Sequence, residues 1–217
     1  MITPHSFTSK FPSNMKTFIK ASLAFLFFAA ITTSCSKESM NTAATKQSTN
    51  QSASQADDGV QTLHHVGEMF GGGIIFYLDS TKLHGLIAAP SDMTVNGSTQ
   101  IPWYNGSYVV TGAKGAAIGA GLKNTNKIVN VQGSGTYAAK LCADLVLNGF
   151  SDWFLPSKKE LNALYNHRAK VPGLNATNYW SSTESDANNA WDQVFDGGFK
   201  FADDKSFTIR VRAVRSF

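Results

Sequence analysis

A short apolar segment near the N-terminus decides which part of this chain is available to form a domain. Residues 21–31 are almost entirely apolar, Lys16 and Lys20 precede them, and Thr-Thr-Ser-Cys follows at residues 32–35. A basic start, an apolar core and small residues at a cleavage point are the three parts of a secretory signal. The apolar run is also shorter than the about 20 residues that span a bilayer as a helix. We therefore expect residues 1–34 to be a signal peptide that is removed.

The cysteine at the end of this segment indicates a lipid anchor. A cysteine at the cleavage point resembles a bacterial lipoprotein signal, in which that cysteine is lipidated and becomes the new N-terminus. Cys35 is the predicted lipidation site, although Thr32 stands where such signals usually carry leucine. Met15 suits the start of a signal better than Met1, so residues 1–14 are interpreted as an upstream extension. The predicted location is the cell envelope, with a membrane anchor, at the outer membrane or the cell surface.

Loss of the signal changes the charge and the cysteine content. The whole chain has a formal net charge of +4, but residues 1–34 contain three lysines and no acid. The remaining chain has 16 basic and 15 acidic residues, a net charge of +1 that argues against a nucleic-acid partner. Apart from Cys35, only Cys142 is left, so we expect no intrachain disulfide. The hydrophobic core must then hold the fold.

A polar segment separates the predicted anchor from the predicted domain. Residues 36–61 consist mainly of Ser, Thr, Asn, Gln, Ala and Lys, a composition that buries too little surface to offset the entropy of ordering. A flexible coil of about 26 residues has a root-mean-square reach of roughly 25–30 Å. We therefore interpret residues 35–61 as a lipidated cysteine with a disordered tether, and residues 62–217 as one domain.

The first half of this domain predicts a hairpin and then loops. Residues 73–79 have the pattern of a buried strand, and residues 84–90, closed by Pro90, are the predicted hairpin partner. Residues 91–135 are rich in Gly and Asn with scattered apolar side chains, so long loops are expected there.

The second half predicts two helices and a return to strands. Residues 136–147 place apolar side chains on one helical face, and Ser157 with Glu160 forms a capping box that begins the second helix. Residues 194–199 contain an Asp-Gly hairpin turn, and residues 207–214 alternate apolar with mainly basic positions. This order predicts an α+β domain with short antiparallel strands, two helices and long loops, whose first and last strands meet.

Several motifs, taken together and in order, closely resemble the Lcl C-terminal domain family, formerly a domain of unknown function. The motifs are GGIIFYL at 72–78, HGL at 84–86, GFSDWFLPSKKEL at 149–161, YWSSTE at 179–184 and VRAVR at 211–215. The family looks related to Fibrobacter-type paralogous lipoprotein domains and, more distantly, to C-type-lectin-like folds, including the formylglycine-generating-enzyme type. The resemblance implies a C-type-lectin-like single domain and a role in bacterial surface adhesion. Some members bind sulfated glycosaminoglycans.

Candidate ligand-binding residues near the C-terminus are basic. Arg210 and Arg212 share one face of the predicted last strand, and Lys200 or Lys205 is expected on an adjacent strand. Arginine pairs with sulfate or carboxylate through two parallel hydrogen bonds, which suits a polyanionic ligand. An ordinary solvated strand edge is the alternative interpretation.

Aromatic residues supply the other candidates. Trp103 and Tyr104 lie in a loop rich in Gly and Asn, where an exposed ring would stack on a sugar, and packing of that loop onto the domain is the alternative. The other tryptophans of the domain are expected in its core: Trp153, Trp180 and Trp191.

The sequence does not favour an enzyme or a metal protein. No serine lies in a Gly-x-Ser-x-Gly motif, and Cys142 on an apolar helix face is expected to be a buried, unreactive thiol. The histidines lack metal-ligand spacing. We predict no catalytic residue, cofactor or metal, and we leave calcium open as a lesser alternative. The oxygen-rich segment that raises it contains Glu184, Asp186, Asn188, Asn189, Asp192, Asp203 and Asp204.

The sequence thus leaves three functional hypotheses. The first is a lipid-anchored surface protein that adheres by binding a glycan or sulfated polysaccharide. The second is a structural envelope lipoprotein that contacts other proteins or the cell wall without binding a glycan. The third is a degenerate relative of an oxidase fold. The ligand and the oligomeric state do not follow from these residues.

Overall fold

The computed structural model describes residues 62–217. The predicted signal peptide, Cys35 and the tether of residues 35–61 lie outside the described residues. The strands of the described part are β1 (Met69–Phe70), β2 (Gly73–Leu78), β3 (Gly85–Ala88), β4 (Ile101–Pro102), β5 (Asn178–Glu184), β6 (Asn189–Val194), β7 (Lys200–Asp204), β8 (Thr208–Ile209) and β9 (Val214–Ser216). The helices are α1 (Gly121–Gln132), α2 (Ala138–Ala143), α3 (Lys158–Asn166) and the short 3-10 helix η1 (Arg168–Lys170). Within residues 62–217, none of the helices combines the length and apolarity that crossing a bilayer requires.

The first sheet joins the two ends of the domain. Its order is β1-β2-β3-β9, and all neighbouring strands are antiparallel. Ile87 of β3 lies opposite Ile75 of β2 on one side and Arg215 of β9 on the other. The predicted hairpin is therefore confirmed, and so is the prediction that the C-terminal strand returns to it.

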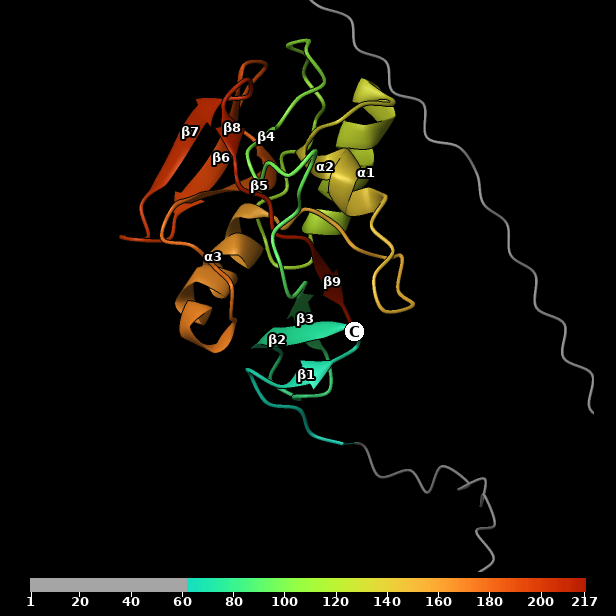
Figure 1. The fold of residues 1–217 in the computed structure, drawn as a ribbon, viewed down its shortest axis with the longest axis vertical. Coiled ribbons are helices and arrows are strands. Elements are labelled where there is room, and N and C mark those ends of the chain that lie inside the picture. The colour runs from blue at the N-terminus through green and yellow to red at the C-terminus, as the bar shows by residue number, and fades with distance from the viewer. Residues whose placement is uncertain (1–61) are drawn as a thin grey trace, which may run out of the picture. The chain divides into compact units, whose positions relative to one another are not determined.

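The second large sheet is a three-stranded meander of β5, β6 and β7. The predicted Asp-Gly turn connects β6 to β7, and the Val194 N–H donates to the carbonyl of Phe199 across it. Strands β4 and β8 form a separate two-stranded sheet. Figure 1 shows β6, β7 and β8 toward one end of the long axis of the described domain and β1, β2 and β3 toward the other.

Helix α1 corrects the expectation of loops over residues 91–135. Its sequence is polar and begins with glycine, so local propensity argues against it. Tertiary contacts stabilise it instead: Asn124 exchanges hydrogen bonds with the backbone of Gly115, and the Thr125 hydroxyl accepts from the Leu155 N–H. A side chain at Gly121 would collide with Phe154 and the Glu160 carboxylate. The described domain therefore has three α-helices instead of the expected two.

The other helices agree better with the sequence. Helix α2 covers only Ala138–Ala143 of the predicted 136–147. Helix α3 begins with the predicted capping box, in which Ser157 Oγ accepts from the Glu160 N–H and the Glu160 carboxylate accepts from the Ser157 N–H. An α+β domain with short antiparallel strands is confirmed.

The predicted continuous strand over residues 207–214 is wrong. Strand β8 ends at Ile209, Arg210 forms an isolated parallel bridge to Tyr179, and β9 starts only at Val214. Phe207 is exposed, but from Val211 onward both alternating faces turn inward, because Arg212 and Val214 are buried as fully as Val211. This stretch passes through the interior of the domain, so its basic face is not a solvent-facing strand surface.

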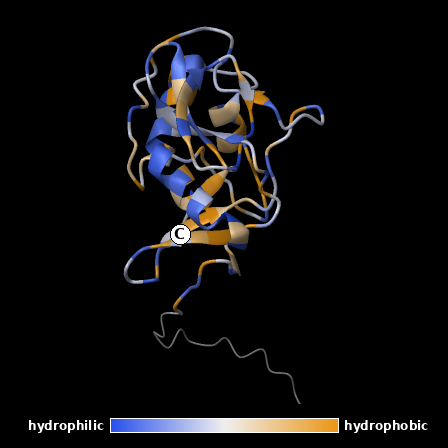
Figure 2. Cartoon of the chain, turned by 90° about the vertical axis from the view of Figure 1, so that its left-hand side faces the viewer, coloured by the Kyte–Doolittle hydropathy of each residue, from blue (hydrophilic) through white to orange (hydrophobic). Residues whose placement is uncertain are grey.

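The core consists of two apolar clusters. The larger cluster contains Trp103, Trp153 and Trp180 and reaches from β2 and β3 to helices α1 and α2. The smaller cluster packs α3 against both large sheets through residues such as Phe76 and Leu164. Figure 2 shows the strands next to the C-terminus coloured mainly as hydrophobic. Burial of such side chains contributes about 1.5–3 kcal/mol each, which is consistent with a fold without disulfides.

Candidate functional site

The predicted arginine face lies inside the domain. The Arg212 side chain is fully buried, and its guanidinium donates to Asp92 Oδ1 and to the carbonyls of Ala89 and Gly173. Arg210 is 20% exposed and donates to Asp92 Oδ2 at 2.9 Å. The expectation of an exposed basic face is therefore corrected for both arginines. We call Asp92, Arg210, Arg212 and Tyr179, whose hydroxyl also donates to Asp92, the Asp92 cluster.

Lys205 is buried in a second ionic network. Its ammonium donates to Glu184 Oε1 at 2.8 Å and to the carbonyls of Val109 and Ala187. Burial opposes ionisation of Glu184, but the hydrogen bonds from Lys205 and the Thr111 N–H outweigh it, so the pKa of this carboxyl lies below its ordinary value. Lys205 connects the loop before α1 to the β5–β6 turn. Its charge is buried and therefore cannot contact a ligand at the surface.

The predicted aromatic pair divides between core and surface. Trp103 is fully buried, and its indole N–H donates to the Ser181 carbonyl at 2.8 Å, so packing decides its role. Tyr104 is half-buried and stacks on Tyr108, with ring centroids 5.0 Å apart. Tyr108 is 44% exposed, and its hydroxyl donates to Asp204 Oδ1. This tyrosine was not among the predicted site residues.

One tryptophan that was expected in the core lies at the surface. Trp153 and Trp180 are buried as predicted, but Trp191 of β6 is only half-buried. The Lys158 ammonium lies 2.9 Å from the centroid of a Trp191 ring, a cation–π contact. Ala202 of β7 lies opposite Trp191 and is too small to cover it.

A second lysine lies near this pair. Lys200 is exposed at the start of β7, opposite Gln193. Burial lowers the pKa of Lys158, and the positive charge of Lys200 lowers it further. Within residues 62–217, neither lysine has a carboxylate at ion-pair distance. The side chains of Lys158, Trp191 and Lys200 form a surface that we call the Trp191 face.

Amide groups extend this surface along α3. Asn162 lies one turn after Lys158, and its side-chain oxygen accepts from Gln193 Nε2 at 3.1 Å. The same nitrogen donates to the Gly198 carbonyl, which ties the β6–β7 turn to the helix. The Trp191 face therefore combines an aromatic ring, two cations and neighbouring amides. Such groups suit a sugar ring that carries sulfate or carboxylate.

The oxygen-rich segment is mostly engaged in internal hydrogen bonds. Glu184 bonds Lys205, Asp186 Oδ1 accepts from backbone N–H groups of the β5–β6 turn, and Asp204 accepts from Tyr108. Among residues 62–217, no group of three or more His, Cys, Asp or Glu side chains is arranged to hold a metal ion.

Asp192 is buried without a full set of hydrogen-bond partners. It follows Trp191 on β6 and is 1% exposed. Its Oδ2 accepts from the Asn178 amide, whereas Oδ1 has no hydrogen-bond partner among the described residues. Burial raises the pKa of Asp192 to about 6, and the nearby charge of Asp203 adds to the increase.

A family model named Lcl C-terminal domain matches residues 93–215, more than half of the 217-residue chain. The chain belongs to the Lcl C-terminal domain family. The match includes the Asp92 cluster except Asp92 itself, and all of the Trp191 face. Strands β1, β2 and β3 precede it, although β9 pairs with β3 in one sheet.

Comparisons with curated proteins and solved structures add little to the assignment of this chain to the Lcl C-terminal domain family. No curated protein matches the chain. The crystal structure of a fimbrial protein from Bacteroides ovatus is similar with a TM-score of 0.41 and 16% sequence identity. The alignment covers 60% of this chain and 35% of the fimbrial protein, so the chain spans about a third of that protein's length.

Sequence reasoning missed Lys158, Trp191 and Tyr108. Lys158 is the first residue after the capping Ser157, a position whose side chain usually stays near solvent, and this was the available signal. For Trp191, the alternation on β6 shows which residues share a face but does not show which face is covered.

Proposed function

We propose that this chain is a lipid-anchored bacterial surface protein whose Lcl C-terminal domain, C-type-lectin-like in architecture, binds an anionic glycan through the Trp191 face. The observation that supports this is the approach of Lys158 and Lys200 to a half-buried tryptophan without a carboxylate partner in the described residues. A cation without a partner near an aromatic surface is complementary to a sulfated or uronic-acid sugar. The protein is not proposed to be an enzyme.

A bound anion would relieve the unfavourable electrostatics of this face. The Lys158 ammonium is partly desolvated and repelled by Lys200, as the lowered pKa shows. A sulfate or carboxylate between the two lysines attracts both, and the Trp191 ring holds the Lys158 ammonium at the surface through the cation–π contact. Each contact is modest, so firm attachment comes from many anchored copies that engage one polymer.

The anchor is a separate part of the proposal. The sequence of residues 16–35 supports lipidation at Cys35, and the tether of residues 35–61 separates that lipid from the domain. The proposed location is the outer membrane or the cell surface. The membrane and an extracellular glycan are then the two proposed partners.

A second candidate function rests on the exposed aromatics near β7. Phe199, Phe201 and Phe207 are 67%, 47% and 54% exposed. Exposed apolar groups beside an edge strand favour contact with another protein. The alternative proposal is therefore a structural envelope lipoprotein that contacts proteins or the cell wall and binds no glycan.

Binding to heparin and to a glycan array, with and without calcium, tests the first proposal. The unlipidated chain from residue 36 is compared with Lys158→Ala/Lys200→Ala and with Trp191→Ala. We expect the double variant to bind heparin at least about tenfold more weakly, because a hydrogen bond to a charged group contributes about 1.5–3 kcal/mol. Added salt should weaken binding by the parent chain.

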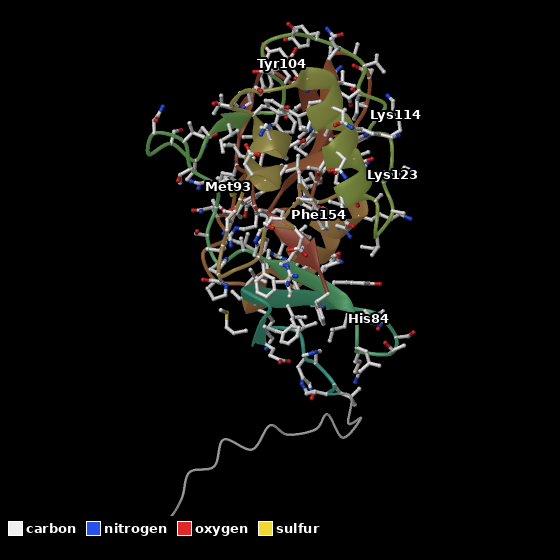
Figure 3. The ribbon with its side chains drawn as sticks, turned by 90° about the vertical axis from the view of Figure 1, so that its right-hand side faces the viewer. His84, Met93, Tyr104, Lys114, Lys123 and Phe154 are labelled. Carbon is white, nitrogen blue, oxygen red and sulfur yellow. The ribbon has the colours of Figure 1, made fainter. Side chains whose placement is uncertain are left out.

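The matched control removes the same charge elsewhere. Lys123 and Lys170 are exposed, and neither has a carboxylate at ion-pair distance in the described chain. Lys123→Ala/Lys170→Ala should therefore bind like the parent (Figure 3 labels Lys123). An equal loss in both double variants would indicate attraction by net charge alone. Absence of any glycan binding would favour the structural alternative.

A further inference from the structure

The end of the domain that contains β1 exposes apolar side chains. Leu63 is 55% exposed, Met69 is 64% exposed and Phe70 is 38% exposed. Phe70 packs on Phe217, with ring centroids 5.1 Å apart, and His64 stacks on Phe70 at 4.1 Å. We call Leu63, Met69, Phe70 and Phe217 the β1 patch. An exposed cluster of this kind in an exported protein indicates an interaction surface.

Two open hollows lie beside the β1 patch. Hollows of about 540 and 460 Å³ share His64 as a lining residue. The first hollow is also lined by Asp79 and Lys82, and the second by Glu68. Lys82 is exposed and has no carboxylate at ion-pair distance within the described chain.

The acids at this end are engaged locally. Glu68 accepts hydrogen bonds from the His65 N–H and pairs with His64, and Asp79 accepts from the backbone and hydroxyl of Thr81. These hydrogen bonds hold the pKa of both carboxyls below its ordinary value, so both are ionised and offset the charge of Lys82. The apolar side chains therefore decide what this end binds, and they suit a bilayer surface, where rings and thioethers enter the headgroup layer.

The position of the β1 patch in the chain supports the same occupant. The described chain begins at Thr62, which itself lines the second hollow. The predicted lipidated Cys35 lies about 26 residues earlier, a root-mean-square reach of roughly 25–30 Å for a flexible coil. In Figure 3, His84 lies at one end of the domain, whereas Tyr104 and Lys114 lie at the other. Docking at the β1 patch would therefore direct the Tyr104 end away from the bilayer.

We propose that the β1 patch docks on the surface of a lipid bilayer, with Met69 and Phe70 in the headgroup layer. The docking rests on the proposed lipid anchor at Cys35 but not on glycan binding by the Trp191 face. Strands β1, β2 and β3 lie before the family match at residues 93–215, so this surface is a feature of the chain outside that match.

Vesicle co-sedimentation of the unlipidated chain from residue 36 tests the proposal. The vesicles are phosphatidylcholine alone or phosphatidylcholine with phosphatidylglycerol. We expect binding to both kinds of vesicle that falls about tenfold in Leu63→Ser/Met69→Ser, because each side chain would lose burial in the headgroup layer. Absence of binding to either kind of vesicle by the parent chain would overturn the proposal.

Matched controls separate docking from general stickiness. Leu122→Ser and Phe201→Ser remove exposed apolar groups from α1 and β7, which are 44% and 47% exposed, and should bind vesicles like the parent. Melting temperatures of all variants show that each is folded. Equal losses in Leu63→Ser/Met69→Ser and in the controls would overturn the proposal.

Two further outcomes separate lipid docking from self-association at the β1 patch and from glycan binding at the Trp191 face. Self-association that is abolished by Leu63→Ser/Met69→Ser, without vesicle binding, would assign the β1 patch to a second copy of the chain and overturn the lipid proposal. Lys158→Ala/Lys200→Ala should bind vesicles normally. Failure of glycan binding therefore leaves this result untouched, and failure of vesicle binding leaves the glycan proposal standing.

Discussion

The Asp92 cluster and the Trp191 face contain the same kinds of side chain and use them in opposite ways. In the Asp92 cluster, two arginines share one carboxylate, and the remaining donors of Arg212 bond to carbonyls. In the Trp191 face, Lys158 and Lys200 lie close enough to repel each other and have no carboxylate partner in the described chain. Basic and aromatic residues therefore indicate a ligand only where the fold leaves their charge unsatisfied.

The largest effect should come from breaking the Asp92 cluster. Arg212→Ala leaves the Asp92 carboxylate and the carbonyls of Ala89 and Gly173 without their main donor. We expect the free energy of unfolding to fall by about 3–5 kcal/mol, because two interior carbonyls lose their donor and Asp92 keeps only part of its partners, Arg210 and Tyr179 among them. Urea unfolding measures this loss.

The matched change in the Trp191 face should leave stability almost unaltered. Lys200→Ala removes an exposed side chain and should change the free energy of unfolding by less than about 0.5 kcal/mol. If Arg212→Ala folded as stably as Lys200→Ala and lost heparin binding, the arginines would be the ligand site and the comparison would be reversed.

Asp192 provides a second test, because it is a buried carboxyl without the full set of partners that Asp92 has. Its pKa is raised from 3.8 to about 6 in the folded state, chiefly by burial. Between these two values the folded protein binds more protons than the unfolded chain, so stability falls as pH rises. Above pH 7 the cost of the ionised group is fully present.

Asp192→Asn should therefore stabilise the protein at pH 7.5 by about 1–3 kcal/mol relative to the parent. The advantage should shrink as pH falls through about 6 and disappear below about 4, where the parent carboxyl is protonated in both states. Melting temperatures across pH measure this. A stability difference that does not change with pH would mean that the carboxyl is not desolvated in the folded protein.

The parts of the fold that the sequence predicted depend on local signals. The capping box at Ser157 and Glu160 uses residues three apart, and the first hairpin joins segments separated by one turn. Helix α1 has no such signal, because its buried Asn124 and Thr125 bond to distant backbone groups. A polar sequence that becomes helical through tertiary hydrogen bonds has the local sequence pattern of a loop, so a loop is predicted.

The site was harder to predict, because alternation along a segment does not show which side is covered. The pattern of residues 207–214 separates Arg210 and Arg212 from Val211, but from Val211 onward the segment is buried on both sides. The reverse holds for Trp191, which reads as a core residue and lies half-exposed beside Lys158. Only packing by other elements distinguishes the two cases. Lys200 is the residue of the original basic set that is exposed and lies in the Trp191 face.

The smallest expected effect concerns the coupling of the two lysines in the Trp191 face. Burial is the main cause of the lowered pKa of Lys158, and the charge of Lys200 is the second. Lys200→Gln should therefore raise the pKa of Lys158 only part of the way to its ordinary value, because the burial remains. NMR titration of the Lys158 side chain measures this change. Lys123→Gln is the control and should leave the titration unchanged. If Lys200→Gln also left it unchanged, the two ammonium groups would be too far apart to share one anion, and a single sulfate or carboxylate between them would be excluded from the binding mode.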